Sequence, residues 1–414
     1  VAGRGSGADA QLRGQGPTRA SGPPGADTRL KPSRIVAIAC LVLFAAAFLV
    51  LEWNFIHSAG KRPGADGLRG AAESLRDAWS GSKARPNVSM KLEFPVPQDA
   101  RDEACMGRRY DLDALPRVSL VIPYLNEQWE HIRLTVSSIV ENTPEQLLDE
   151  IFFIDDGNDL DMRHFQLTDL HPKVRVHRNF ARGGLIKAKV IGAALTHSPV
   201  IVFMESHCIL QPQWLEPLLE VLASPSGERT IAVPVLDILT ENNFSDYIRA
   251  DYFIGGFDWQ LNFNWDALQG VRNTSWRSPE PYGSPALSGG LFAVRRDWWE
   301  RSGTYDVEMA EWGGEHVEMS LRIWRCHGQI LMVPCSRIAH MFRAASPYVR
   351  HSEAMFWNSK RVALAWLDDY LDKVYEAAPH LRDQDGGDVR ERLALRSRLQ
   401  CRSMDWYIDN IFPE

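Results

Sequence analysis

Two common nucleotide-binding signatures are missing from this sequence. No Gly-x-Gly-x-x-Gly fingerprint follows the first predicted strand, and no Gly-Lys-Ser or Gly-Lys-Thr loop occurs anywhere in the 414 residues. The first absence argues against a dinucleotide oxidoreductase, because those glycines shape the turn that carries the pyrophosphate. The second absence argues against a P-loop phosphoryl-transfer enzyme.

The sequence also lacks a surplus of basic residues and any Cys-x-x-Cys pair. Its 46 Lys and Arg against 53 Asp and Glu give a net charge of -7, whereas a general nucleic-acid binder normally carries a basic domain. The spacing of the six cysteines therefore gives no support for a zinc site with thiolate ligands. Their number alone does not decide whether they are free thiols or form disulfides. With 45% hydrophobic and 24% charged residues, the chain is neither wholly disordered nor a multi-spanning membrane protein.

One long apolar run is present near the N-terminus. Residues 1–34 are rich in Gly, Ala, Pro and Arg and are expected to form a disordered cytoplasmic tail. The next 17 residues, 35–51, carry no charge, and as a helix they would span about 26 Å of a hydrocarbon core of about 30 Å. Because the apolar part of a cleaved signal peptide usually has only about 7 to 15 residues, we expect an uncleaved transmembrane signal anchor over residues 35–56.

The charges around this run predict which side of the membrane the remaining chain occupies. Six basic residues precede the run, against two acidic ones. Positively charged flanks stay cytoplasmic, so the C-terminal bulk is expected to be lumenal. Residues 57–115 are predicted to form a lumenal stem, because they are polar and contain Pro63, Pro86, Pro95 and Pro97. Asn-x-Ser sequons begin at Asn87, Asn243 and Asn273.

From Val118 onward, short apolar runs alternate with helical patterns. Four runs read as buried strands, namely Val118–Pro123, Glu150–Ile154, Val174–His177 and Val200–Met204. The first helical pattern has an apolar stripe of Ile132, Val136, Ile139 and Val140, and the second covers Leu185–Leu195. This alternation predicts an α/β fold with a mostly parallel, doubly wound sheet.

Acidic residues and a histidine follow two of these predicted strands. Ligands of doubly wound sheets bind beyond the carboxyl ends of the strands, which places Asp155, Asp156, Glu205 and His207 on one rim. Oxygen and nitrogen ligands together suit a divalent ion such as Mn²⁺ or Zn²⁺. A metal on an acidic rim is suited to neutralising a diphosphate leaving group. His340 would add a ligand, and Arg343 a fixed cation, if the fold returns them to this rim.

Several segments, in order along the chain, carry a family resemblance. They include EIFFIDDGND, RGGLIKAKVIGAA, FMESHC, GGFDWQLNFNW, SGGLFAV, EWGGEH and VPCSRIAHMFR. From about Arg101 to Glu414 the chain resembles the catalytic region of the polypeptide N-acetylgalactosaminyltransferases, which are type II Golgi membrane enzymes. The resemblance implies a GT-A nucleotide-diphospho-sugar transferase fold of the glycosyltransferase family 2-like superfamily, preceded by a single transmembrane helix. It assigns residues 116–345 to the GT-A catalytic domain and 346–414 to the C-terminal part of the catalytic region.

The resemblance also implies an activity and a set of site residues. The expected reaction is retaining transfer of GalNAc from UDP-GalNAc to Ser or Thr hydroxyls of proteins, with Mn²⁺ as cofactor and no nucleic acid involved. The matching positions are Glu205, His207 and His340 for the metal, Asp156 and Arg182 for the nucleotide, Arg343 and Tyr348 for the diphosphate, Gly289 and Gly290 for the turn beside the donor, and Trp312 and Glu315 for the catalytic sugar site.

The family pattern pairs the cysteines as well. It implies disulfides Cys105–Cys335 and Cys326–Cys401, with Cys208 and Cys40 free. Disulfides agree with a lumenal catalytic domain.

Four positions, and the C-terminal end of the sequence, depart from the family pattern. Glu205 replaces the usual aspartate of the metal motif, and Leu125 replaces a histidine near the nucleotide. His316 follows WGGE where asparagine is usual, and Ser346 replaces a histidine on the diphosphate side. The sequence ends at Glu414, where relatives continue into a ricin-type lectin domain, so either this member lacks that domain or the sequence is shortened.

Three functions are therefore weighed. The first is the Golgi GalNAc-transferase itself. The second is a GT-A enzyme that uses UDP-GlcNAc or UDP-Gal, and the third is a catalytically silent lumenal binding protein. The complete set of WGGE, His207, His340 and Arg343 favours an active enzyme.

Overall fold

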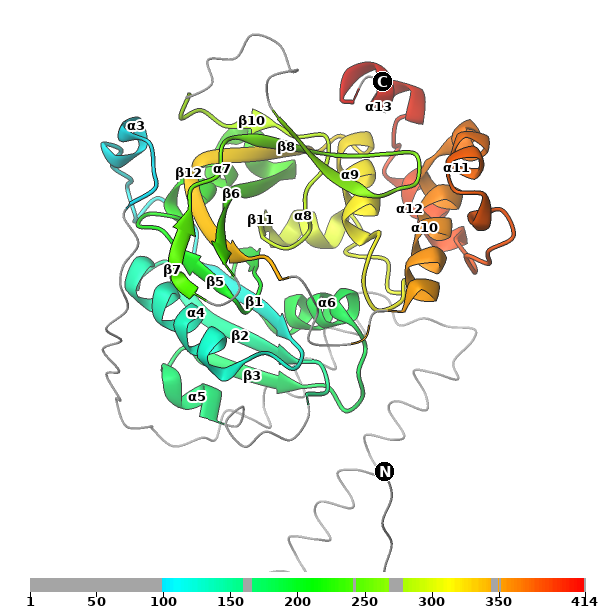
Figure 1. Cartoon of the computed structure of the whole chain (residues 1–414). Helices are drawn as coiled ribbons and strands as arrows, with labels where there is room; N and C mark the ends of the chain where they lie inside the picture. Colours follow the sequence, from blue (N-terminus) through cyan, green and yellow to red (C-terminus); the bar gives the residue numbers. More distant parts are fainter. Residues whose placement is uncertain are drawn as a thin grey trace, which may run out of the picture. The chain divides into compact units, whose positions relative to one another are not determined.

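The computed structural model describes residues 99–158, 166–240, 243–267, 278–343, 349 and 351–412 (Figure 1). The predicted tail, the transmembrane anchor and most of the stem lie outside these residues, as do Cys40, Asn87, Asn273, Ser346 and Tyr348. None of the helices in the described ranges combines the length and the apolar character that crossing a bilayer requires.

A ten-stranded sheet forms the centre of the fold. Its main path runs β10-β12-β6-β11-β4-β1-β2-β3, while β5 pairs with β12 and β7 with β6. The four predicted strands are present as β1 (Val118–Tyr124), β2 (Leu148–Asp155), β3 (Val174–Arg178) and β4 (Val200–Phe203). They are parallel to one another, as the alternating pattern predicted.

The sheet as a whole is mixed, so the prediction of a mostly parallel sheet is wrong beyond these four strands. The others are β5 (Cys208–Leu210), β6 (Thr230–Thr240), β7 (Asn243–Ile248), β10 (Tyr282–Gly283), β11 (Phe292–Arg295) and β12 (Gln329–Met341). β12 runs parallel to β6, but β11 is antiparallel to both β4 and β6, and β5 and β10 are antiparallel to β12. Antiparallel neighbours need no helical crossover, so βα alternation does not reveal them. A separate hairpin joins β8 (Phe253–Phe257) to β9 (Phe263–Ala267).

Helices cover both faces of this sheet (Figure 1). In chain order the first are α3 (Glu103–Met106), α4 (Trp129–Asn142), α5 (Leu167–Leu170), α6 (Leu185–Leu195), α7 (Glu216–Ala223) and the 3-10 turn η2 (Pro225–Arg229). The later ones are α8 (Arg296–Arg301), α9 (Glu315–Arg325), α10 (Ser352–Trp366), η4 (Asp368–Tyr370), α11 (Leu371–Ala377), η5 (Pro379–Leu381), α12 (Arg390–Arg398) and α13 (Met404–Asn410).

The alternation of side chains along β1 divides the core in two. Leu120 and Ile122 belong to an apolar cluster with α4 and α7, while Val121 belongs to a cluster with α6, α8, α9 and α10. The predicted stripe on α4 is confirmed for Ile132, Val136 and Ile139, which are buried. It is wrong for Val140, which is 37% exposed. The buried face of α4 also takes in Leu134, Thr135 and Ser138, so at about 100° per residue Val140 falls just outside it.

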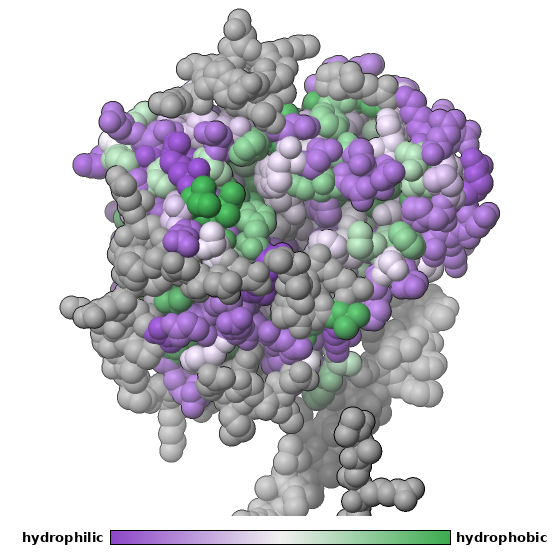
Figure 2. All heavy atoms as spheres, in the orientation of Figure 1, coloured by the Kyte–Doolittle hydropathy of each residue, from purple (hydrophilic) through white to green (hydrophobic). Residues whose placement is uncertain are grey.

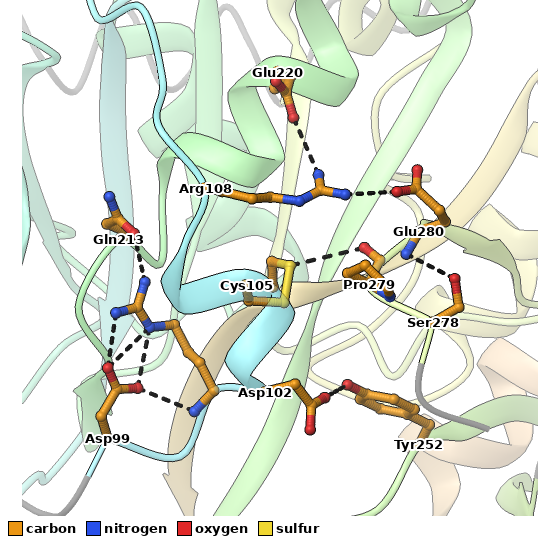
Figure 3. Close-up of a disulfide and its surroundings, with 12 residues drawn as sticks. Asp99, Asp102, Cys105, Arg108, Gln213, Glu220, Tyr252, Ser278, Pro279 and Glu280 are labelled. Carbon is orange, nitrogen blue, oxygen red and sulfur yellow. Dashed lines mark hydrogen bonds and ion pairs between the residues drawn. A yellow bond between two sulfur atoms is a disulfide. The ribbon is translucent and has the colours of Figure 1, made fainter. Parts of the chain in front are cut away.

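Both predicted disulfides are present, and Cys208 is free and buried. The Cys105–Cys335 bond attaches α3 to β12 across 230 residues of sequence. Figure 3 shows Arg108 close to this bond, with its guanidinium 2.6 Å from Glu280 and 3.5 Å from Glu220. The N-terminal end of the described chain is thereby fastened to β12 of the sheet.

The surface seen in Figure 2 is polar over α11 and α12, and the apolar atoms on that face are broken into small patches. Separate exposed apolar residues of this kind are normal for a folded protein.

Gly192 of α6 gives a test of how tightly the helix packs on the sheet. A Cβ atom there would lie 2.4 Å from Cγ1 of Val121 and 3.0 Å from Cγ1 of Ile154. We expect Gly192→Ala to lower the free energy of unfolding by about 1–3 kcal/mol through overpacking, although alanine is ordinarily the better helix former. The change would be measured by urea unfolding.

Gly107→Ala is the matched control, because a Cβ at Gly107 meets nothing closer than 4.0 Å. Equal unfolding midpoints for the two variants would contradict the close contact between α6 and β1.

Candidate metal centre and active site

A cavity of about 300 Å³ opens at the carboxyl ends of β1, β2 and β4, beside the end of β12. Seven predicted site residues line it: Asp156, Arg182, Glu205, His207, Trp312, His340 and Arg343. Leu125, at the position of the family's histidine, also lines the cavity. The rim predicted from the strand ends therefore exists, and β12 returns His340 and Arg343 to it.

Three potential metal ligands converge at this rim. Oε2 of Glu205 lies 2.6 Å from Nε2 of His340 and 3.0 Å from Nε2 of His207. The two Nε2 atoms are 3.1 Å apart. Ligand atoms that share one ion at about 2.0–2.2 Å lie about 3 Å from one another. The three side chains therefore fit a single divalent cation, and they are the one such group of three among the described residues.

Strand pairing brings the two histidines together across 133 residues of sequence. β5 runs antiparallel to β12, with Cys208 opposite His340 in the register. His207 directly precedes this pair, so both imidazoles lie at the same end of the two strands. The convergence thus follows from backbone hydrogen bonds and does not depend on a bound ion.

A buried glutamate, Glu127, lies behind one of the three candidate ligands, His207. Its carboxylate accepts hydrogen bonds from Nδ1 of His207 (2.8 Å), Nδ1 of His131 (2.9 Å) and Nη2 of Arg343 (2.6 Å). Burial alone would raise the pKa of Glu127, but the bonds from His131 and His207 hold that pKa far below its usual value. Because an ionised carboxylate can only accept, Nδ1 of His207 carries the proton and its Nε2 lone pair is directed to the metal position.

Glu205 is also held in its charged form. Burial by itself would raise its pKa, but His340 and His207 lower it well below the ordinary value. Burial by itself would lower the pKa of His207, yet the hydrogen bonds to Glu127 and Glu205 raise it. The rim therefore presents a carboxylate between two imidazoles, a donor set that suits Mn²⁺ or Zn²⁺.

The two aspartates at the end of β2 have different tasks. Asp156 lines the cavity and accepts hydrogen bonds from the backbone N–H groups of Gly183 (2.9 Å) and Gly184 (2.8 Å). It thereby fixes the loop that carries Arg182 and leads into α6. Asp155 instead accepts from Arg178 (2.9 Å) and from the backbone of the following turn, so it builds the turn and does not line the cavity.

The glycine-rich segments lie next to the metal ligands. Glu315 is buried, and its Oε2 accepts a hydrogen bond from the backbone N–H of Gly313 (2.8 Å). Burial alone would raise the pKa of Glu315, but His316 and Lys189 lower it. Gly289 has a φ of +82°, and a Cβ on it would approach Oε1 of Glu315 to 3.7 Å. Glu315, Gly289 and Gly290 therefore lie in the wall behind the cavity lining, and Trp312 is exposed to the cavity.

Three residues of this site were not assigned a role from the sequence. Glu127 and His131 act through His207 and Arg343, and Lys189 is a fully buried lysine that donates to the carbonyl of Gly289. Lys189 belongs to the segment RGGLIKAKVIGAA, and Glu127 lies in the loop after β1, two residues beyond Leu125. Their roles arise from burial and from partners far away in the sequence.

Comparison with known proteins first gives the class of the chain. Residues 119–299 match the family described as Glycosyl transferase family 2, and residues 271–345 match the N-terminal domain of galactosyltransferase. A crystal structure of GalNAc-T7 with UDP, GalNAc and Mn²⁺ superposes with a TM-score of 0.69 at 32% identity, covering 76% of this chain and 60% of that one. The GT-A glycosyltransferase fold is thereby confirmed.

Sequence relatives narrow this class. The chain is 41% identical over 327 residues to polypeptide N-acetylgalactosaminyltransferase 11 of Xenopus tropicalis, covering 76% of this chain and 53% of the relative. It is 38% identical over 329 residues to the inactive polypeptide N-acetylgalactosaminyltransferase-like protein 5 of Mus musculus, covering 78% of this chain and 75% of that protein. The chain therefore belongs to the polypeptide N-acetylgalactosaminyltransferase family. It spans about half the length of the Xenopus relative.

Glu127→Gln tests the support of the metal ligands. The amide cannot supply the charge and the acceptors that orient His207 and Arg343, so affinity for Mn²⁺ should fall by about 10- to 100-fold, as for other groups that orient a metal ligand. Isothermal titration of Mn²⁺ into the purified protein would measure the loss.

Glu130→Gln serves as the control, because Glu130 lies three residues further on, is half-exposed and pairs with Arg133. An unchanged affinity in Glu127→Gln, or an equal loss in the control, would show that Glu127 does not position the site.

Proposed function

We propose that the chain is a Mn²⁺-dependent transferase that moves GalNAc from UDP-GalNAc to Ser and Thr hydroxyls of proteins with retention of configuration, which initiates mucin-type O-glycosylation. The observation that carries the proposal is the convergence of Glu205, His207 and His340 within 4.8 Å in a chain of this family. Support also comes from the solved relative, whose crystals contain UDP, GalNAc and Mn²⁺.

The diphosphate end of the donor is assigned to the metal and the cations beside it. When bound, Mn²⁺ supplies the positive charge that stabilises the departing UDP. Glu205, His207 and His340 would hold it. Arg343 lines the same cavity, and its bond to Glu127 keeps the guanidinium fixed, so it adds a second positive charge at no cost of reorganisation. Tyr348 keeps its predicted diphosphate role, although it lies outside the described residues.

The nucleoside and the sugar are assigned to different groups of residues around the cavity. Asp156 and Arg182 would contact the uridine side, at the loop that Asp156 fixes. The transferred sugar would lie between the Gly289–Gly290 turn and the WGGE segment. There Trp312 offers a flat apolar ring to the sugar, and the buried carboxylate of Glu315, just behind the cavity lining, holds the backbone N–H of Gly313 in the same segment.

One observation favours an alternative. The mouse relative, of which this chain covers three quarters, carries the name inactive. A silent binding protein would account for Leu125 at the histidine position. The complete metal triad, its support by Glu127 and the fixed Arg343 favour catalysis, since a binding protein has no use for a metal that stabilises a leaving group. Use of UDP-GlcNAc or UDP-Gal by the same site is the other alternative.

We also propose that the catalytic domain faces the Golgi lumen on a single N-terminal anchor. The two disulfides support an oxidising compartment. The uncharged run over residues 35–51 and its basic flank support the type II orientation.

A donor panel tests the activity. The purified protein would receive Mn²⁺, a mixed Ser/Thr peptide library and UDP-GalNAc, UDP-GlcNAc or UDP-Gal, with products read by mass spectrometry. We expect GalNAc-peptide from UDP-GalNAc alone, and a loss of activity of at least about 100-fold in His340→Ala or after addition of EDTA.

His197→Ala is the control, because His197 is an exposed histidine outside the cavity lining. Full activity in EDTA would contradict the metal assignment. Binding of Mn²⁺ without turnover of any donor would favour the silent binding protein.

A further inference from the structure

The carboxylate of Glu205 has neighbours on two sides. The two histidines lie on one side, and the Gly289–Gly290 turn lies on the other. A Cβ atom built on Gly290 would lie 2.6 Å from Oε1 of Glu205 and 3.4 Å from its Cδ atom. Oε1 thus occupies the place that a side chain at position 290 would take. Oε2 of the same carboxylate faces His340 and His207. The glutamate therefore bridges the space between the turn and the histidine pair.

The turn itself is fixed by a buried lysine. Lys189 of α6 is fully buried, and its Nζ donates to the carbonyl oxygen of Gly289 at 2.6 Å. The rings of Phe203, Phe292 and Tyr305 surround the ammonium, with centroids 5.9 to 6.0 Å away. Burial lowers the pKa of Lys189, and the nearby carboxylates of Glu205 and Glu315 act against this and favour its charged form. A buried cation without these acidic neighbours would be costly.

The geometry assigns Lys189 and Gly290 a shared positioning role. We propose that Lys189, by holding the carbonyl of Gly289, places the turn at the distance that a glutamate at position 205 needs, and that the missing side chain at Gly290 gives that glutamate its room. The turn, whose glycines match the family pattern, then leaves room for the longer carboxylate of glutamate in this chain. The inference rests on the proposed metal role of Glu205, His207 and His340.

This arrangement makes a specific prediction about chain length. Aspartate is shorter by one methylene, about 1.5 Å, so its carboxylate cannot contact the turn and also lie between the histidines. A side chain at position 290 should consequently harm the site only when position 205 is glutamate. Glu205 and Gly290 should be energetically coupled, as residues in direct contact are.

A double-mutant cycle on Mn²⁺ affinity, without any nucleotide sugar, tests the coupling. Glu205→Asp and Gly290→Ala should each weaken Mn²⁺ binding by about 10-fold or more. The double variant should bind no more weakly than Glu205→Asp alone, because the shorter carboxylate no longer meets the new methyl group. Gly107→Ala, at a remote and open position, should bind as the unaltered chain does.

Strictly multiplicative losses in the cycle, or an unchanged affinity in Gly290→Ala, would overturn the inference. Lys189→Met, which keeps length but removes the donor and the charge, should weaken Mn²⁺ binding by about 10-fold as well, while Lys189→Arg should restore part of it. Thermal unfolding of each variant separates this effect from misfolding. A folded Lys189→Met protein with unaltered affinity would overturn the role of the lysine.

The experiment distinguishes a failure of this inference from a failure of the proposed transferase function. If the unaltered chain binds Mn²⁺ and shows the coupling but transfers no sugar, the inference stands and the transferase proposal fails. If the unaltered chain binds no Mn²⁺, the metal role itself is wrong and both fail.

Discussion

The ionised carboxylate of Glu127 is the interaction on which the rest of the site depends. It follows β1, accepts from His131 at the start of α4, from His207 after β4 and from Arg343 after β12. Four separate parts of the chain therefore share one buried negative charge. Because such a charge is tolerated only when its acceptors are filled, folding has to bring these donors to it, together with the Ser206 hydroxyl and the backbone N–H of Gln128. The same bonds orient a metal ligand and immobilise a guanidinium at the cavity, so the stability of the rim and its chemistry have a common cause.

The sequence predicted the part of this protein that local patterns encode. Four apolar runs gave β1 to β4 and their parallel order, and the strand-end rule placed Asp156, Glu205 and His207 at one rim. The antiparallel strands were not predicted, because, apart from the β6–β7 hairpin, they pair over long sequence distances without a periodic signal. The different tasks of Asp155 and Asp156 could not be told apart either, since they depend on which way two adjacent carboxylates point. Lys189 was missed because only the packed structure shows that it is fully buried.

Family membership identifies the fold of the chain, whereas the local geometry bears on whether the chain is an active enzyme. The comparisons give the fold and the family, yet the relatives include a protein named inactive as well as transferases. The distinction between them rests on individual atoms. This chain departs from the family pattern at Glu205 and Leu125. It keeps the pattern at Arg343, whose guanidinium is fixed by Glu127. The contact between Glu205 and Gly290 shows how a longer carboxylate fits without displacing the histidine pair.

The proposed chemistry depends on a single metal centre formed by one carboxylate and two imidazoles. Pulsed electron paramagnetic resonance of Mn²⁺ bound to the full chain, in the presence of UDP, measures it most directly. A centre of this composition should give nitrogen hyperfine couplings from two imidazoles, reduced to one in His340→Ala. Bound Mn²⁺ without any nitrogen coupling would contradict it.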